Sequence, residues 1–201
     1  VVENDLNLDL VELLSQASKA LTDVLTEQDT VDQVMRYFYD RLRGYTADQG
    51  FKADVFEAVL AVKPTTPTDF IKRLQAVSAF RELEQAEALA AGNKRIGNIL
   101  RKNNAEGDAG TIDDSLLQEE AEKALAAKLA EISITVQPLI AKADYSAVLT
   151  QLASMRDTVD GFFDQVMVMA DDEAVRQNRL ALLNQTRALF LGVADISSLQ
   201  S

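Results

Sequence analysis

The sequence has no cysteine and no histidine among its 201 residues. Without cysteine it can form neither a disulfide nor a thiolate metal site, which fits a reducing compartment. Without histidine it cannot build a Ser-His or Cys-His nucleophilic pair, an imidazole metal centre or a His-Asp phosphohydrolase site. Carboxylate chemistry stays open, because Asp and Glu number 32, although most acidic residues on helices are solvated. We expect no catalytic residue, no metal site and no cofactor in this chain.

Long hydrophobic runs are also missing. The longest uninterrupted apolar stretches are a few residues, whereas a membrane-spanning helix needs about 20. No charged-then-apolar secretory leader is visible at the start, and the first residue is Val rather than Met, which suggests a fragment of a longer protein. We therefore expect no membrane role and a cytoplasmic location.

Glycine and proline are scarce, with 8 and 3 residues respectively. Apolar residues instead recur at helical spacing almost throughout, which predicts an all-α fold. One such stripe consists of Val34, Met35, Phe38, Leu42 and Tyr45. Further along, Thr66, Pro67 and Asp69 form a pattern typical of a helix start with a capping box.

The one long polar stretch without apolar periodicity is "NNAEGDAGTIDD", residues 103–114, and it predicts a flexible linker. After it, Ser115 and Gln118 suggest a second capping box that opens a long helix, which Pro138 should kink or end. The last helix should run to about Ala194. We predict a helical body over residues 1–83 and a helical bundle over 84–201. No repeat of fixed period is present, so a regular solenoid is rejected.

Positive charge is scarce as well, since the formal net charge is -12 and the isoelectric point is about 4.5. This balance argues against general affinity for RNA or DNA. Yet "NKRIGNILRKN", Asn93 to Asn103, holds four of the 20 basic residues and no acid. On a helix, one face of this segment carries Lys94, Arg95, Asn98, Arg101 and Lys102. Gly92 and Gly97 in the same helix suggest close approach by another helix or a backbone.

This basic face has two interpretations. The plainer one is a solvated helix face whose cations pair with acids brought from other helices. The functional one is a local contact with RNA phosphates, in a protein whose acidic remainder limits non-specific binding.

A second possible basic stripe lies on the last helix. Arg176, Arg179 and Arg187 fall within about 80° of each other, beside Asn178 and Asn184. Guanidinium groups suit phosphates and Asn amides suit base edges, but surface solvation or pairing with Asp is again the alternative. If both stripes formed one RNA face, a continuous positive strip would join Arg95 to Arg179.

Several blocks of the sequence, in the same order, resemble a known family. They are "DRLRGYTADQGF", "DVFEAVLAVKPTTPTDFIKRLQAVSAFREL", "EALAAGNKRIGNILRK", "FFDQVMVMADDEAVRQNRLALL" and "RALFLGVADISSLQ". From about Asp5 to Gln200 the chain resembles the C-terminal part of the bacterial glycyl-tRNA synthetase β subunit. Its later part is similar to the helical anticodon-binding module named for a DALR signature, here weakly matched by Thr186-Arg187-Ala188-Leu189. Thr66 departs from the basic residue expected there.

The resemblance implies a non-catalytic region that engages the anticodon end of glycine tRNA, with neither DNA nor a membrane as partner. It further implies an α subunit, in a heterotetramer, that would hold ATP, magnesium and glycine. The residues expected to contact tRNA are Lys94, Arg95, Asn98, Arg101, Lys102, Arg176, Asn178, Arg179 and Arg187. The alternative is a helical scaffold for subunit or interdomain contacts, which the acidic surface and residues 1–83 suggest.

Overall fold

The computed structural model describes residues 4, 6–21, 24–25, 29–107 and 110–199, and within these ranges all regular structure is helical. The α-helices are α1 Leu10–Ala20, α2 Thr30–Asp48, α3 Ala53–Leu60, α4 Pro67–Arg81, α5 Ala86–Lys102, α6 Glu120–Ala141, α7 Tyr145–Ala153, α8 Arg156–Gln165 and α9 Glu173–Leu191, with short 3-10 turns η1 Asp114–Leu116 and η2 Ile196–Ser198. The all-α prediction is confirmed.

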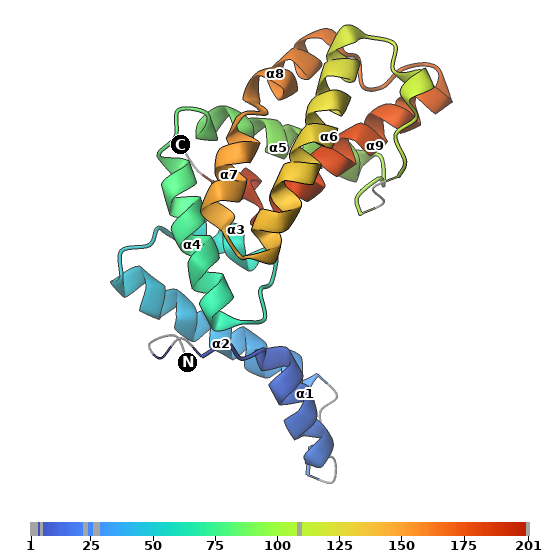
Figure 1. Cartoon of the computed structure of the whole chain (residues 1–201). Coiled ribbons are helices and arrows are strands. Elements are labelled where there is room, and N and C mark those ends of the chain that lie inside the picture. Colours follow the sequence, from blue (N-terminus) through green and yellow to red (C-terminus); the bar gives the residue numbers. More distant parts are fainter. Residues whose placement is uncertain (1–3, 5, 22–23, 26–28, 108–109, 200–201) are drawn as a thin grey trace.

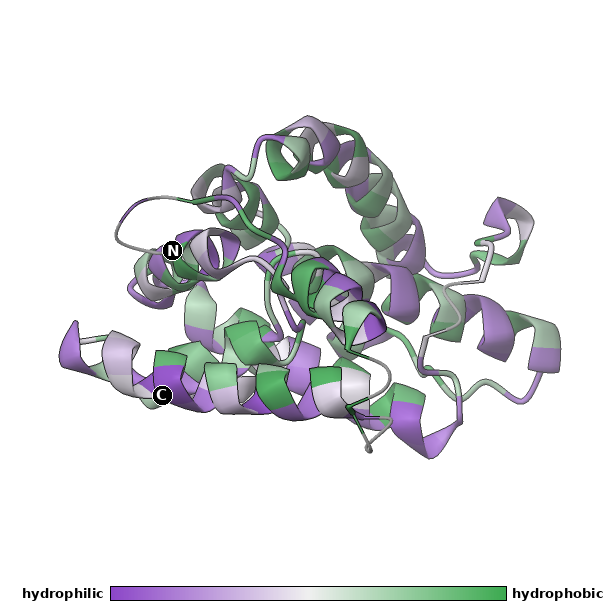
Figure 2. Cartoon of the chain, turned by 90° about the horizontal axis from the view of Figure 1, so that it is seen from below, coloured by the Kyte–Doolittle hydropathy of each residue, from purple (hydrophilic) through white to green (hydrophobic). Residues whose placement is uncertain are grey.

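One hydrophobic core joins the helices on both sides of residue 83. It includes Phe70 of α4, Leu100 of α5, Leu149 of α7 and Phe162 of α8, each with at most 1% of its surface exposed. Figure 2 shows apolar and polar residues alternating along individual helices, the pattern that lets each helix bury one side. The predicted boundary at residue 83 therefore falls within a shared core and stays a prediction.

A polar cluster reinforces this core where α4 meets the end of α9. Asp69 does not close a capping box with Thr66, whose side chain makes no cap bond. Its carboxylate instead accepts hydrogen bonds from Arg73 Nε at 2.7 Å and from the Tyr145 hydroxyl at 2.5 Å. Arg73 Nη1 also donates to the carbonyls of Gly192 and Val193, at 2.9 and 2.7 Å. The cluster connects α4, α7 and the carboxyl end of α9.

Helix α6 begins later than predicted. Ser115 lies in η1, and α6 starts at Glu120. The side chain of Glu122 reaches back to accept hydrogen bonds from the backbone N–H groups of Gln118 and Glu119, both at 2.7 Å. These bonds satisfy donors that a helix start leaves unpaired. Pro138 does not end the helix, which continues to Ala141.

By length and composition α6 could also span a membrane, and it is the one helix of that kind in the described ranges. The absence of long apolar runs did not predict this. The stripe formed by Leu125, Leu129, Ile132 and Val136 is nonetheless buried in the core, and α6 lies against α7, α8 and α9. It is the central packing helix of the bundle.

The segment predicted as a flexible linker is bound to α9 over its described residues. Asn184 Nδ2 donates to the Ala105 carbonyl, Gln185 Nε2 donates to the Gly110 carbonyl at 2.9 Å, and Asn178 bonds both the N–H and the carbonyl of Asp113. Polar composition suggested a free segment, but its backbone groups are satisfied by amide side chains of a helix far away in the sequence.

Helices α1 and α2 extend away from the rest of the bundle (Figure 1). No residue of α1 is buried, and α1 packs mainly on α2. Several of their large apolar side chains are exposed, including Leu13 at 51% and Tyr37 at 60%.

Candidate nucleic-acid interface

Helix α5 presents its basic face to solvent, as its periodicity predicts. Ile96 and Leu100 are fully buried in the core, and α5 packs against α8, α9 and η2. The residues predicted for the opposite face are all exposed: Lys94, Arg95, Asn98, Arg101 and Lys102. A continuous patch of cationic and amide side chains therefore runs along about two turns of the helix.

Most cations on this face have no acidic partner. Within the described ranges, Lys94, Arg95 and Lys102 make no ion pair. Arg101 is the exception: its Nε lies 3.7 Å from Glu106, and its Nη1 donates to Asn98 at 3.4 Å. The alternative in which acids from other helices neutralise the face applies to Arg101 alone, so the other three charges are available to an anion.

The two glycines of α5 lie where side chains of other helices come close. A Cβ added at Gly97 would lie 3.1 Å from Arg187 Nη1 and 3.2 Å from its Cζ. A Cβ at Gly92 would lie 3.1 Å from Val159. The approach comes from the side chains of α9 and α8 respectively, so these glycines allow α5 to pack closely while its basic face stays outward.

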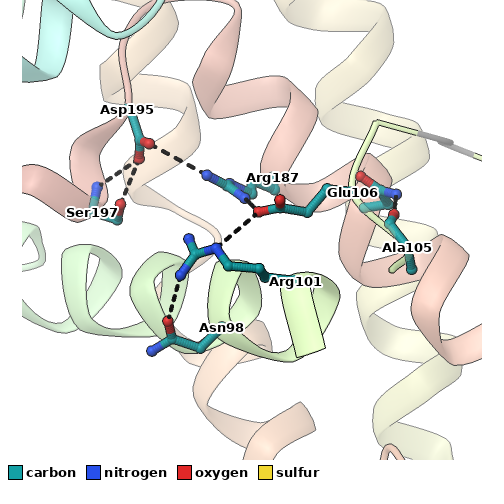
Figure 3. Close-up of polar contacts among 8 residues, drawn as sticks. Asn98, Arg101, Ala105, Glu106, Arg187, Asp195 and Ser197 are labelled. Carbon is teal, nitrogen blue, oxygen red and sulfur yellow. Dashed lines mark hydrogen bonds and ion pairs between the residues drawn. The ribbon is translucent and has the colours of Figure 1, made fainter. Parts of the chain in front are cut away.

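Arg187, which Gly97 accommodates, ties three parts of the chain together (Figure 3). Its Nη1 donates to Glu106 at 3.1 Å and its Nη2 donates to Asp195 at 3.3 Å. Asp195 is held in turn by hydrogen bonds from the Ser197 N–H and hydroxyl, at 3.2 and 2.6 Å. With 15% of its side chain exposed, Arg187 serves mainly to join α9 to η2 and the segment after α5.

Arg179 is inside the protein. Its side chain is 6% exposed, and its Nε forms an ion pair with Glu122, whose side chain is fully buried. Its Nη1 donates to the Met167 carbonyl at 2.8 Å. A guanidinium held in this way cannot reach RNA, and the continuous strip from Arg95 to Arg179 does not exist. This corrects the expectation of an exposed basic stripe on α9.

The ionisation of Glu122 reflects this pairing. Burial of the carboxyl raises its pKa, but the hydrogen bond from Arg179 and those from the backbone N–H groups of Glu119 and Gln118 outweigh burial, so the pKa is lowered. The pair is therefore charged on both sides at neutral pH.

The other α9 residues have structural partners as well. Arg176 Nη1 donates to the Ala170 carbonyl at 2.7 Å, within the turn that precedes the helix. Asn178 and Asn184 are buried, and their amides bind the backbone of residues 105–113. The stripe was drawn correctly on the helical wheel, but neighbouring segments cover it.

One contact of the basic face was not anticipated from the sequence. The Arg95 guanidinium carbon lies 4.1 Å from the centroid of the Phe163 ring on α8. Phe163 was expected to be core, yet it is only partly buried, whereas Phe162 beside it is fully buried. No spacing rule within one helix could have shown this contact between α5 and α8.

In the part of the chain that the structure describes, no group of three or more Asp and Glu side chains is placed to hold a metal ion. The exposed face of α5 instead offers positive charge and amide groups. Together, the fold and this face define the class of protein: an all-helical module with a local basic surface suited to RNA phosphates.

Comparison with known proteins identifies the family. The family model described as the DALR anticodon binding domain matches residues 89–195, which include most of α5 and all of α6 to α9. The chain belongs to this family. The matched region contains the α5 basic face, the Arg187 network and the buried pair of Arg179 and Glu122.

Curated relatives cover nearly the whole chain. It is 54% identical over 199 residues to the glycine–tRNA ligase β subunit of Shewanella halifaxensis. It is 50% identical over 200 residues to that of Pseudoalteromonas translucida, and 52% identical over 200 residues to that of Vibrio atlanticus. These matches include 99% or 100% of this chain but 29% of each relative, so the chain spans under a third of their length.

Proposed function

We propose that this chain is the anticodon-binding region of a glycine–tRNA ligase β subunit and that the exposed face of α5 holds the RNA backbone. The observation that carries the proposal is the set of unpaired cations Lys94, Arg95 and Lys102 within the segment that matches the anticodon binding family. The names of the relatives support glycine tRNA as the ligand.

The contribution of this region would be affinity and selection rather than chemistry. The sequence lacks histidine and cysteine, and the basic face contains no nucleophile next to a base. Glycine activation with ATP and magnesium would take place on an α subunit that forms a heterotetramer with the β subunit. A cytoplasmic location follows from the same assignment, because tRNA charging takes place where the ribosomes work.

The test compares two quadruple variants of the intact ligase with equal changes in net charge. One is Lys94→Ala with Arg95→Ala, Arg101→Ala and Lys102→Ala. The control replaces four exposed cations on other parts of the chain with Ala: Arg36, Lys52, Lys72 and Lys142.

We expect the α5 variant to bind glycine tRNA at least about a hundredfold more weakly, since each lost phosphate contact removes released counterions. The control variant should lose much less. Equal losses in the two variants would show that net charge, and not the α5 face, governs binding. Unchanged affinity in the α5 variant would overturn the assignment.

A second role, contact with other protein, is favoured by α1 and α2. Their exposed apolar side chains, such as Leu13 and Tyr37, have no cover in the described part of the chain. We propose that this pair of helices packs on the remainder of the β subunit, because the relatives are more than three times as long as this chain. Leu13→Glu with Val34→Glu should then release the separately expressed chain from that remainder in a pull-down, and retention would contradict the proposal.

A further inference from the structure

The contact of Arg95 with Phe163 gives the basic face one position that differs chemically from the rest. Lys94 and Lys102 offer compact ammonium charges on flexible stems. Arg95 offers a planar guanidinium whose carbon lies 4.1 Å from the centroid of an aromatic ring. A planar cation placed over an aromatic ring has a fixed orientation, and its second face is parallel to the first.

The ring beneath Arg95 is anchored. Phe163 contacts Phe162 edge to face, with ring centroids 5.6 Å apart and an interplanar angle of 77°. Phe162 is fully buried in the core. The platform therefore rests on the core of the bundle rather than on a loop, which limits the entropy lost when a ligand stacks on it.

The donors of Arg95 are unused. Arg95 is exposed, and it makes no hydrogen bond or ion pair with another residue in the described ranges. The neighbouring acid on α8, Asp160, pairs with Arg156 at 3.7 Å. Both the outer face of the guanidinium and its N–H groups are thus open to a ligand.

We propose that Arg95, held on Phe163, is the stacking platform for one unpaired nucleobase of the bound RNA. This inference rests on the proposed function, since it names the part of the RNA that this position takes. A base would stack on the outer face of the guanidinium, while the ammonium groups of Lys94 and Lys102 bind phosphates on either side. Such stacking needs a base that is splayed out of a helix, as in a loop.

The first experiment separates planarity from charge. Arg95→Lys keeps the charge but removes the planar group, whereas Lys102→Arg is the matched control at a position assigned to phosphate. In the intact ligase, Arg95→Lys should weaken tRNA binding about tenfold, the range expected for loss of one stacked base. The slope of log affinity against log salt concentration should not change. Lys102→Arg should leave both quantities unchanged.

The second experiment identifies the base. Nucleotides of the anticodon loop are replaced one at a time by an abasic nucleotide, and each substituted tRNA is measured against wild type and Arg95→Lys. At the stacked position the two changes should not add, because either one removes the same contact. At every other position they should add.

The outcomes distinguish this inference from the proposed function. If the quadruple α5 variant loses binding but Arg95→Lys binds like wild type, the face contacts RNA and the stacking proposal is wrong. Full additivity at every loop position would also overturn it. Phe163→Leu, checked for unchanged thermal unfolding, should reproduce part of the Arg95→Lys loss, since the guanidinium then loses its support.

Discussion

Arg179 and Glu122 form a buried ion pair across 57 positions of sequence, and it joins α9 to the first turn of α6. The same carboxylate satisfies two backbone N–H groups at the start of α6. One side chain therefore fixes where α6 begins and how α9 packs on it. This relationship accounts for the presence of a strongly basic residue on a helix that offers little charge to the surface.

Removal of one member of this pair should be costly. Glu122→Gln leaves the Arg179 charge buried without its counter-ion, and we expect a loss of about 3 kcal/mol in the free energy of unfolding. Urea denaturation measures it as a lower midpoint at constant slope. Lys123→Ala, which removes an exposed partner of Glu120, should leave the midpoint unchanged. Similar midpoints for the two variants would contradict the structural role of the pair.

The stability of the protein should depend on acid pH through Glu122. Its folded pKa lies below the model value of 4.5, so its contribution is present above that pH and is lost as the pH falls through the folded value. The difference in unfolding free energy between wild type and Glu122→Gln should therefore shrink from neutral pH to about pH 3. A difference that stays constant over this range would show that the carboxylate is not preferentially ionised in the folded state.

Two glycine substitutions should have opposite effects. Gly97→Ala pushes a Cβ against the Arg187 guanidinium at 3.1 Å, and we expect about 1 kcal/mol of destabilisation despite the better helix propensity of Ala. Gly44→Ala on α2 meets nothing within 4 Å and should stabilise by about 0.5 to 1 kcal/mol. Thermal unfolding of both variants checks the pair. Stabilisation by Gly97→Ala would mean that Arg187 moves aside freely.

Tyr145 should ionise at unusually high pH. Its burial and its hydrogen bond to Asp69 raise its pKa to about 12, against the lowering effect of Arg73. A raised folded pKa means that the contribution of this phenol to stability is complete below about pH 10 and declines as the pH rises toward 12. In an ultraviolet titration, Tyr145→Phe should remove absorbance that appears only near pH 12. Loss of absorbance near pH 10 instead would contradict the buried hydrogen bond.

The sequence predicted whatever depends on one helix at a time. The exposed face of α5 and its buried side, with Ile96 and Leu100, followed from spacing of 100° per residue because the core covers only one side. The stripe on α9 had the same spacing, yet Arg179 and Asn178 are buried. A helical wheel shows which residues share a face, and it does not show which distant segment covers that face.

The same limit explains the other differences. Glu122 caps α6 in place of the predicted Ser115 because its carboxylate satisfies Arg179 as well as the helix start, a partnership over long range. The described part of the predicted linker is held by Asn184 and Gln185, residues that are more than 70 positions away. Gly97 was the one local signal of close packing, and it pointed to Arg187.

The most direct test of the account is the salt dependence of glycine tRNA binding by the intact ligase and by the quadruple α5 variant. If the four cations Lys94, Arg95, Arg101 and Lys102 lie against the RNA backbone, the slope of log affinity against log salt concentration should flatten by roughly 3, at 0.7 to 0.9 for each contact. An unchanged slope, with the variant still folded, would show that the basic face of α5 does not bind the RNA.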